Sequence, residues 1–358
     1  MKPYETGDPD LDARIHQLAR DAVAAHAPGH SHTGADIVAE LMVSALKLHR
    51  DDADRGDLKL VNSAVKEMRY SFLIFRNYRE VRKVTVFGSA RTNPDHPNYR
   101  LAAEFASRMA DERGWMVVTG AGPGIMEAAN LGAGADDSFG VNIRLPFEAE
   151  ANPYIHESRL INFKYFFTRK LMFMKESDAF ALFPGGFGTQ DETFELLTLI
   201  QTGKSPISPI VLVEAPGTAY WEGWLEFVKG TLMEQGMITP DDLALFTRVD
   251  SAESAAEEVG RFYENYHSQR FVGDRLVLRL KQQPTTDQIQ QLNDEYAAIL
   301  SAGSIETTTA SDAEIASGDH PELFRLGMQF DRRSLGRLRQ MIDTINGFVA
   351  GEAEHSSD

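Results

Sequence analysis

Short apolar runs alternate with longer stretches of helical periodicity between residues 81 and 267. The runs are rich in β-branched and aromatic residues, and they predict strands over 83–87, 115–119, 139–145, 179–183, 209–214 and 244–249. The intervening periodicity predicts helices near 98–113, 124–135, 162–176, 189–202, 221–235 and 251–267. Strands that are apolar throughout are buried on both faces, which is typical of a parallel sheet with helices on each side. The predicted fold is therefore a doubly wound α/β sheet.

The segments on either side of this core are predicted to be extensions, which divides the chain into 1–80, 81–267 and 268–358. Apolar residues recur at steps of three and four over 36–80 and predict helices there: Ile37, Leu41, Ala45, Leu48, Val65, Met68, Phe72 and Phe75. After 267, we expect one strand within 271–281, a helix over 285–300, a linker over 301–320 and a helix over 321–349. Four arginines make that last helix basic, and we interpret them as a solvated or interdomain face rather than an anion site: Arg332, Arg333, Arg337 and Arg339.

The composition excludes cysteine-dependent sites and disfavours several kinds of binding partner. Of 358 residues, 42% are apolar and 25% are charged, and the absence of Cys excludes disulfides, thiolate zinc sites, iron–sulfur clusters and a Cys nucleophile. The 36 Lys and Arg against 53 Asp and Glu give a net charge of −17, which opposes binding to nucleic acid or to a membrane surface. An acidic protein can still bind a small anion in a pocket whose local charge is positive. The chain has no signal-peptide pattern and no long apolar segment, so we predict a soluble, cytoplasmic protein.

Three histidines lie close together near the N-terminus: His26, His30 and His32. No carboxylate stands at helical spacing to complete a metal site with them. We therefore interpret the segment as a flexible, solvated loop and predict no metal.

Ligands of open α/β sheets bind at the carboxyl ends of strands, so the turns that follow the strands are candidate sites. GSAR at 88–91 offers the Ser89 hydroxyl and the Arg91 guanidinium to an anion, although a tight turn with a solvated Arg explains it equally well. GAGPGIME at 120–127 places its third glycine at Gly124, one position too early for the dinucleotide motif. A standard NAD site is thus excluded, whereas close approach of a phosphate or ribose to Gly122 and Gly124 stays open.

The third turn, PGGFGTQDE at 184–192, opens a predicted helix. Gly185, Gly186 and Gly188 allow several backbone N–H groups to converge, and Thr189 is predicted to cap the helix. The positive end of a helix favours an anion by roughly 0.3–1 kcal/mol, so this turn predicts a phosphate cradle. GKS at 203–205 looks like the end of a P-loop, but it follows a helix and position 198 is Thr, which excludes that motif.

Charged residues surround the predicted cradle. Glu192 lies one turn into the helix, Glu195 one turn further on, and Arg169 on the aromatic segment before it. A helix-dipole role for Glu192 and a salt bridge for Arg169 are the alternatives to a catalytic role. An Arg and a Glu facing a phosphate cradle form the arrangement that sugar chemistry with developing charge requires.

PGGFGTQDE at 184–192, together with Arg169-Lys170, resembles the PGGxGTxxE and RK signatures of the LOG ("Lonely Guy") family of nucleoside 5′-monophosphate phosphoribohydrolases. GSAR at 88–91, GAGPGIMEAAN at 120–130 and GVNIRLPFE at 140–148 resemble other blocks of its bacterial members, so the resemblance covers about 80–235. It implies a Rossmann-like fold and hydrolysis of the N-glycosidic bond of a nucleoside 5′-monophosphate, AMP-like or a cytokinin riboside monophosphate. The implied products are the free base and ribose 5-phosphate, and no cofactor is implied.

Carried over by position, the resemblance implies catalytic roles for Arg169 and Glu192. It implies that the 5′-phosphate and ribose are held by Gly185, Gly186, Gly188, Thr189, Ser89, Gly122 and Gly124. A homodimer or higher homo-oligomer is also implied, with the aromatic stretch 163–173 as a candidate interface. Ala121 and Glu127 stand where plant-type members have Gly, and together with the long flanks they leave the preferred base open.

Two other functions compete with this one. A decarboxylase would need pyridoxal phosphate on a Lys, and nothing around Lys164, Lys170 or Lys175 indicates such a setting. A non-catalytic carrier of a phosphorylated ligand, such as molybdenum cofactor, uses the same glycine-rich loop. The presence of both Arg169 and Glu192 favours catalysis, because a carrier needs only the cradle.

Overall fold

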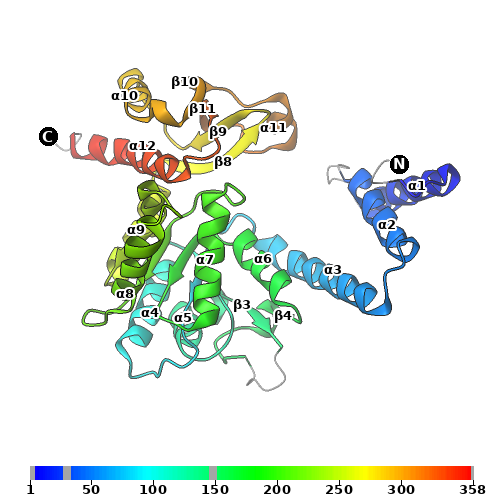
Figure 1. Cartoon of the computed structure of the whole chain (residues 1–358), viewed down its shortest axis with the longest axis horizontal. Helices are drawn as coiled ribbons and strands as arrows, with labels where there is room; N and C mark the ends of the chain where they lie inside the picture. Colours follow the sequence, from blue (N-terminus) through cyan, green and yellow to red (C-terminus); the bar gives the residue numbers. More distant parts are fainter. Residues whose placement is uncertain (1–4, 27–33, 145–150, 356–358) are drawn as a thin grey trace. The chain divides into compact units, whose positions relative to one another are not determined.

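Seven strands form one parallel sheet in the computed structural model, which describes residues 5–26, 34–144 and 151–355. The strand order is β4-β3-β2-β1-β5-β6-β7, and every residue of β1, β2, β5 and β6 is buried. The strands are β1 Lys83–Phe87, β2 Met116–Thr119, β3 Ser138–Ile143, β4 Leu160–Phe163, β5 Ala179–Leu182, β6 Ile210–Val213 and β7 Thr247–Val249. Helices flank the sheet (Figure 1), so the predicted α/β, Rossmann-like doubly wound fold is confirmed.

The helices that flank this sheet follow the predicted segments closely. They are α4 Pro97–Ser107, α5 Ile125–Ala133, α6 Phe166–Glu176, α7 Phe187–Gln201, α8 Tyr220–Phe227 and α9 Ala252–Phe262. Two of them continue as π-turns, over Arg108–Glu112 and Val228–Met233. Short 3-10 turns occur at Arg76–Tyr78, Ala135–Asp137, Glu157–Arg159, Pro240–Leu245 and Ala297–Ile299.

Strand β4 was missed by the sequence prediction, which began a helix near residue 162. Ile161 and Phe163 are buried, and Leu160–Phe163 pairs with β3 in parallel register. Asn142 on β3 also donates to the Asn162 side chain at 2.9 Å. The helix begins only at Phe166, because Leu160–Phe163 pair with the sheet edge instead of joining the helix.

The chain divides into two units, residues 1–67 with 316–319 and the remainder. In the first unit, α1 (Pro9–His26) packs against α2 (Ala35–Arg50) over a small core of Ile15, Ala19, Ala39 and Val43. The long α3 spans Arg55–Phe75. The predicted histidine loop lies largely at 27–33, outside the described residues.

The C-terminal extension contains an antiparallel four-stranded sheet in the order β10-β11-β9-β8. Its elements are β8 Tyr266–Val272, β9 Arg275–Leu280, α10 Thr286–Tyr296, β10 Leu300–Thr308, α11 Asp312–Ser317, β11 Phe324–Phe330 and α12 Leu335–His355. Two predictions were wrong here. The expected linker over 301–320 contains β10 and α11, and the expected helix over 321–349 starts with β11. Strand β10 escaped detection because it is a polar edge strand on which only Ile305 is buried.

The arginines near the start of α12 contact the protein itself. Arg339 is buried and forms an ion pair with Glu258 of α9 at 3.0 Å. Arg337 lies over the Tyr296 ring, and Arg332 over the Phe271 ring. These contacts lie within one of the two units, and the buried Arg339 is not part of a solvated face.

Among the described residues, no helix combines the length and apolarity needed to cross a membrane.

Candidate active site

A cavity of about 710 Å³ opens at the carboxyl ends of β1, β2 and β5. It lies where the strand order reverses, which is the usual ligand position in this class of sheet. Among the predicted site residues, its lining includes Ser89, Arg169, Gly185, Gly186, Gly188, Thr189 and Glu192. Gly122 and Gly124 are not in the lining.

The glycine-rich turn before α7 leaves space at the helix start. None of Gly185, Gly186 and Gly188 is among the glycines with positive φ, so backbone strain does not require them. A Cβ at Gly186 or Gly188 would meet nothing within 4 Å. Open space beside the first turn of a helix is what an anion needs to reach backbone N–H groups.

Thr189 does not cap α7, contrary to the prediction. The N-cap is Gly186, with no side-chain cap bond, and Thr189 lies inside the first turn, where it is buried. Its hydroxyl lies against Gly185, where a Cβ would overlap it. Thr189 thus packs against Gly185 of the glycine-rich turn.

The glycines of the second turn serve packing. Gly124 has a φ of 70° and begins α5, and a Cβ there would overlap the Ser89 carbonyl oxygen. Ile125 N–H donates to that oxygen at 3.1 Å, and Ser89 N–H donates to the Pro184 carbonyl at 3.1 Å. The three glycine-rich turns are therefore tied to one another through Ser89.

Arg169 is held in the cavity wall by a backbone carbonyl of β3. Its Nε donates to the Val141 carbonyl at 2.8 Å, and its guanidinium carbon lies 5.3 Å from the centre of the Phe173 ring. A Cβ at Gly120 would overlap Arg169 Nη2, so glycine at that position makes room for the guanidinium. Gly120, the first residue after β2, also lines the cavity and was not among the predicted site residues.

Glu192 is a buried carboxylate in the cavity lining, with 6% of its surface exposed. Its Oε2 lies 3.4 Å from Lys170 Nζ, which also contacts Asp191 at 2.8 Å and Glu195 at 2.6 Å. Burial raises the pKa of Glu192 above its ordinary value, although the charges of Lys170 and Arg169 oppose the shift. Burial alone would lower the pKa of Lys170, but its carboxylate partners hold it above the ordinary value.

Other cavity residues escaped the sequence prediction. Met126, Phe166, Phe187 and Gln190 line the same space, and Phe187 is 97% exposed. Gln190 lies within the motif and Met126 within the second turn, but neither residue type signals a ligand contact by itself.

The chain is similar in sequence to a known protein family and to curated proteins. The family model described as "Possible lysine decarboxylase" matches residues 124–259. A cytokinin riboside 5′-monophosphate phosphoribohydrolase of Mycobacterium tuberculosis is 30% identical over 174 residues, which cover 48% of this chain and 90% of that protein. The protein belongs to the LOG family. The resemblance seen in the motifs is thereby confirmed.

The matches of other relatives to this LOG family member extend over a smaller part of its chain. An Arabidopsis thaliana cytokinin riboside 5′-monophosphate phosphoribohydrolase is 32% identical over 91 residues, 25% of this chain and 41% of that protein. The solved structure of a molybdenum cofactor carrier protein from Chlamydomonas reinhardtii is 20% identical, with a TM-score of 0.36, covering 51% of this chain and 97% of that one. The fold assignment rests on the strand order itself.

The match to the family model includes α5 to α8, most of α9 and the PGGFGTQDE turn, but not the GSAR turn at 88–91 or the C-terminal sheet. Of the block GVNIRLPFE, residues 145–148 lie outside the described residues.

Proposed function

We propose that this LOG family member hydrolyses the N-glycosidic bond of a nucleoside 5′-monophosphate. The C1′–N bond breaks, water supplies a hydroxyl to C1′ and a proton to the base, and the products are the free base and ribose 5-phosphate. The observation that carries this proposal is one cavity that holds an open helix N-terminus, an arginine and a buried glutamate. No cofactor or metal enters the proposed reaction.

The 5′-phosphate is proposed to bind at the start of α7. Gly186 and Gly188 leave space there, and the helix end provides N–H donors and a positive potential. Gly185, Thr189 and Ser89 hold this loop in place rather than adding charge. Gly122 and Gly124 are proposed to act through packing of the second turn.

Glu192 is proposed to stabilise the cationic sugar. Cleavage of the glycosidic bond leaves an oxocarbenium-like sugar with positive charge, which a nearby carboxylate favours. Because Glu192 is shielded from water, its charge acts there with less screening than at the surface. Arg169 is proposed to offset negative charge on the phosphate or on the departing base.

The substrate class is proposed from the relatives, whose names specify cytokinin riboside 5′-monophosphate. We include AMP-like nucleotides, since the adenine ring is common to both. The cytoplasm is the proposed location.

A homodimer or higher homo-oligomer is proposed through the outer face of α6. Phe166, Phe167 and Leu171 are 51%, 52% and 49% exposed, and Phe166 also lines the cavity. Apolar side chains gathered beside a site are typical of a surface that another subunit covers.

The test is release of free base from a panel of nucleoside 5′-monophosphates, followed by chromatography. We expect base and ribose 5-phosphate from at least one purine nucleotide, and loss of both with Arg169→Ala and Glu192→Gln. Tight nucleotide binding without release would overturn the hydrolase and favour a carrier of a phosphorylated ligand.

A further inference from the structure

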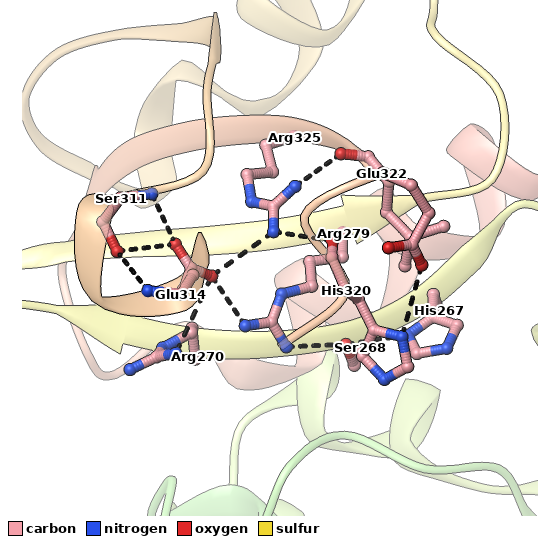
Figure 2. A network of polar contacts seen from close by, with 10 residues as sticks. His267, Ser268, Arg270, Arg279, Ser311, Glu314, His320, Glu322 and Arg325 are labelled. Carbon is pink, nitrogen blue, oxygen red and sulfur yellow. Dashed lines mark hydrogen bonds and ion pairs between the residues drawn. The ribbon is translucent and has the colours of Figure 1, made fainter. Parts of the chain in front are cut away.

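Arg91 lies in the GSAR turn that follows β1 and lines the cavity that also holds Arg169 and Glu192. It is exposed, and its guanidinium forms no hydrogen bond, ion pair or ring contact with the part of the chain that the structure describes. Arg279 and Arg325, by contrast, both contact Glu314 in the C-terminal sheet (Figure 2). The N–H donors of the Arg91 guanidinium are therefore available to a ligand.

The backbone of the GSAR turn is fixed beside the proposed phosphate cradle. The Arg91 N–H donates to the Ser89 hydroxyl at 3.1 Å, and the Ser89 N–H donates to the Pro184 carbonyl at 3.1 Å. A Cβ on Gly185 would lie 3.1 Å from the Ser89 nitrogen, so the two turns are in close contact. The exposed guanidinium therefore extends from a backbone that is held directly against the glycine-rich turn.

Arg91 and the start of α7 belong to opposite walls of the cavity. Strands β1 and β5 are neighbours at the point where the strand order reverses, so the crossover from β1 to β2 and that from β5 to β6 run in opposite directions. Because such crossovers are right-handed, α4 and α7 lie on opposite faces of the sheet. The turn that carries Arg91 leads into α4, so a ligand at the N-terminus of α7 meets Arg91 from the other wall.

The charges beside the cradle favour a further cation there. Asp191 and Glu192 line the cavity in the first turns of α7. Both contact Lys170, which also pairs with Glu195. A phosphate group carries about 1.5–2 negative charges at pH 7, and carboxylates close to it repel it. The helix N-terminus offsets roughly half a unit charge, and a guanidinium that binds phosphate oxygens in a bidentate manner supplies more.

Arg169, the other cationic side chain of the lining, lies at a different strand end. Its Nε donates to the Val141 carbonyl of β3, and its Nη2 lies in the space that Gly120 leaves after β2. Strand β1 separates β2 from β5, whereas the Arg91 turn directly contacts the turn after β5. Since neighbouring strands are about 4.8 Å apart, this order places Arg91 toward the phosphate of a nucleotide and Arg169 toward its sugar and base.

We propose that Arg91 is the charged side chain that recognises the 5′-phosphate, from the wall opposite the α7 N-terminus, and that it makes the site specific for phosphorylated over free nucleosides. Arg169 is then left to the sugar and the departing base. The identity of the substrate as a nucleotide rests on the proposed function, whereas the contact between Arg91 and a sugar phosphate is measured without turnover.

Binding is tested by calorimetric titration of the full chain with ribose 5-phosphate, which carries the phosphate and needs no base. We expect the affinity to fall about 10- to 100-fold in Arg91→Gln, the usual effect of losing a hydrogen bond to a charged group. Arg91→Lys keeps the charge without the planar fork and should lose less. Arg79→Gln, the same change on an exposed Arg outside the cavity lining, is the matched control. Unchanged affinity in Arg91→Gln, an equal loss in Arg79→Gln, or no binding by the wild-type protein overturns the role of Arg91.

Specificity is tested by steady-state kinetics with the best nucleoside 5′-monophosphate and the corresponding free nucleoside. Arg91→Gln should raise KM for the nucleotide about tenfold or more with little change in kcat, because the phosphate contact is made before and during the reaction alike. The preference for the nucleotide over the nucleoside should narrow by a similar factor. A loss of kcat at unchanged KM, or an unchanged preference, overturns the recognition role. A wild-type protein that releases no base contradicts the proposed function, and the titration with ribose 5-phosphate still decides the role of Arg91.

Discussion

The Tyr220 hydroxyl donates a hydrogen bond to the carbonyl oxygen of Gly185 at 2.6 Å. That hydroxyl also accepts from the Gln190 side-chain amide at 2.6 Å, while the backbone N–H of Tyr220 is held by Glu214 at 3.0 Å. A trans peptide directs its N–H opposite to its C=O, so fixing the Gly185 carbonyl also fixes the N–H of Gly186. A residue of α8, outside the PGGFGTQDE motif, thereby positions the proposed phosphate cradle.

Removing this hydroxyl should weaken substrate binding more than the chemical step. We expect Tyr220→Phe to raise KM by about 2- to 10-fold with little change in kcat, since a typical hydrogen bond is worth about 0.5–1.5 kcal/mol. Steady-state kinetics with the best substrate measure this. Tyr70→Phe, on an exposed face of α3, should match the wild type. A loss confined to kcat would contradict a positioning role at the phosphate.

Glu192→Gln keeps the shape of the side chain and removes its charge. We expect turnover to fall by about 10²–10⁴-fold, the usual contribution of a well-placed catalytic carboxyl group. Single-turnover base release measures the chemical step directly. Glu195→Gln is the matched control, because Glu195 shares Lys170 but does not line the cavity. Equal losses in the two variants would argue that the ion cluster, rather than Glu192, matters.

The dependence of activity on pH should report the ionisation of Glu192. Burial raises its pKa, and the proposed role needs the carboxylate form, so activity should fall as pH drops through that raised pKa. Lys170→Met removes a cation 3.4 Å from Glu192, which raises the pKa further and moves the acid limb to higher pH. Profiles of kcat/KM against pH test this, with Lys164→Met as the control. An acid limb that stays at the same pH in Lys170→Met would contradict its assignment to the ionisation of Glu192.

Two glycine substitutions should separate packing from ligand binding. Gly188→Ala places a methyl group in open space within a helix, so we expect unchanged or slightly higher stability but a clear rise in KM for the nucleotide. Gly124→Ala meets a positive φ and the Ser89 carbonyl, so we expect it to lower the free energy of unfolding by about 2 kcal/mol or more. Denaturant unfolding and kinetics on both variants measure the contrast. Similar stabilities would contradict the packing role of Gly124.

Glu314 should stabilise the C-terminal sheet in a pH-dependent way. Burial alone would raise its pKa, but hydrogen bonds from Ser311 and Arg279 and the charge of Arg325 lower it to about 2. Because the folded pKa lies below the ordinary 4.5, this stabilisation is complete above about pH 4.5 and is lost as the pH falls toward 2. We expect Glu314→Gln to cost about 3–5 kcal/mol at pH 7, since it removes the charged carboxylate that the buried Arg279 and Arg325 contact.

Denaturant unfolding at pH 7 and at pH 3 measures this difference, which should shrink at the lower pH. Glu306→Gln removes an exposed partner of Arg275 in the same sheet and should change stability little. Equal effects of the two substitutions would contradict the importance of the buried cluster.

Sequence reasoning alone predicted the parallel sheet, and several of its proposed site residues line one cavity in the structure. Buried strands such as β1 and β5 must be apolar along their whole length, and the cradle needs glycines at specific positions after a strand, so both leave local signals in the chain. Arg169 and Glu192 can be proposed from the sequence because Glu192 ends the PGGFGTQDE motif and Arg169 lies on the predicted helix before it.

Tertiary structure decided everything that depends on contacts between distant segments. Strands β4 and β10 lie at sheet edges, where neighbouring strands rather than their own composition recruit them. The support of Gly185 by Tyr220, the ion pair of Lys170 with Glu195 and the room that Gly120 leaves for Arg169 each join residues from different elements. A linear pattern records whether a position is apolar or flexible, but it does not record which side chain will meet it once the helices pack on the sheet.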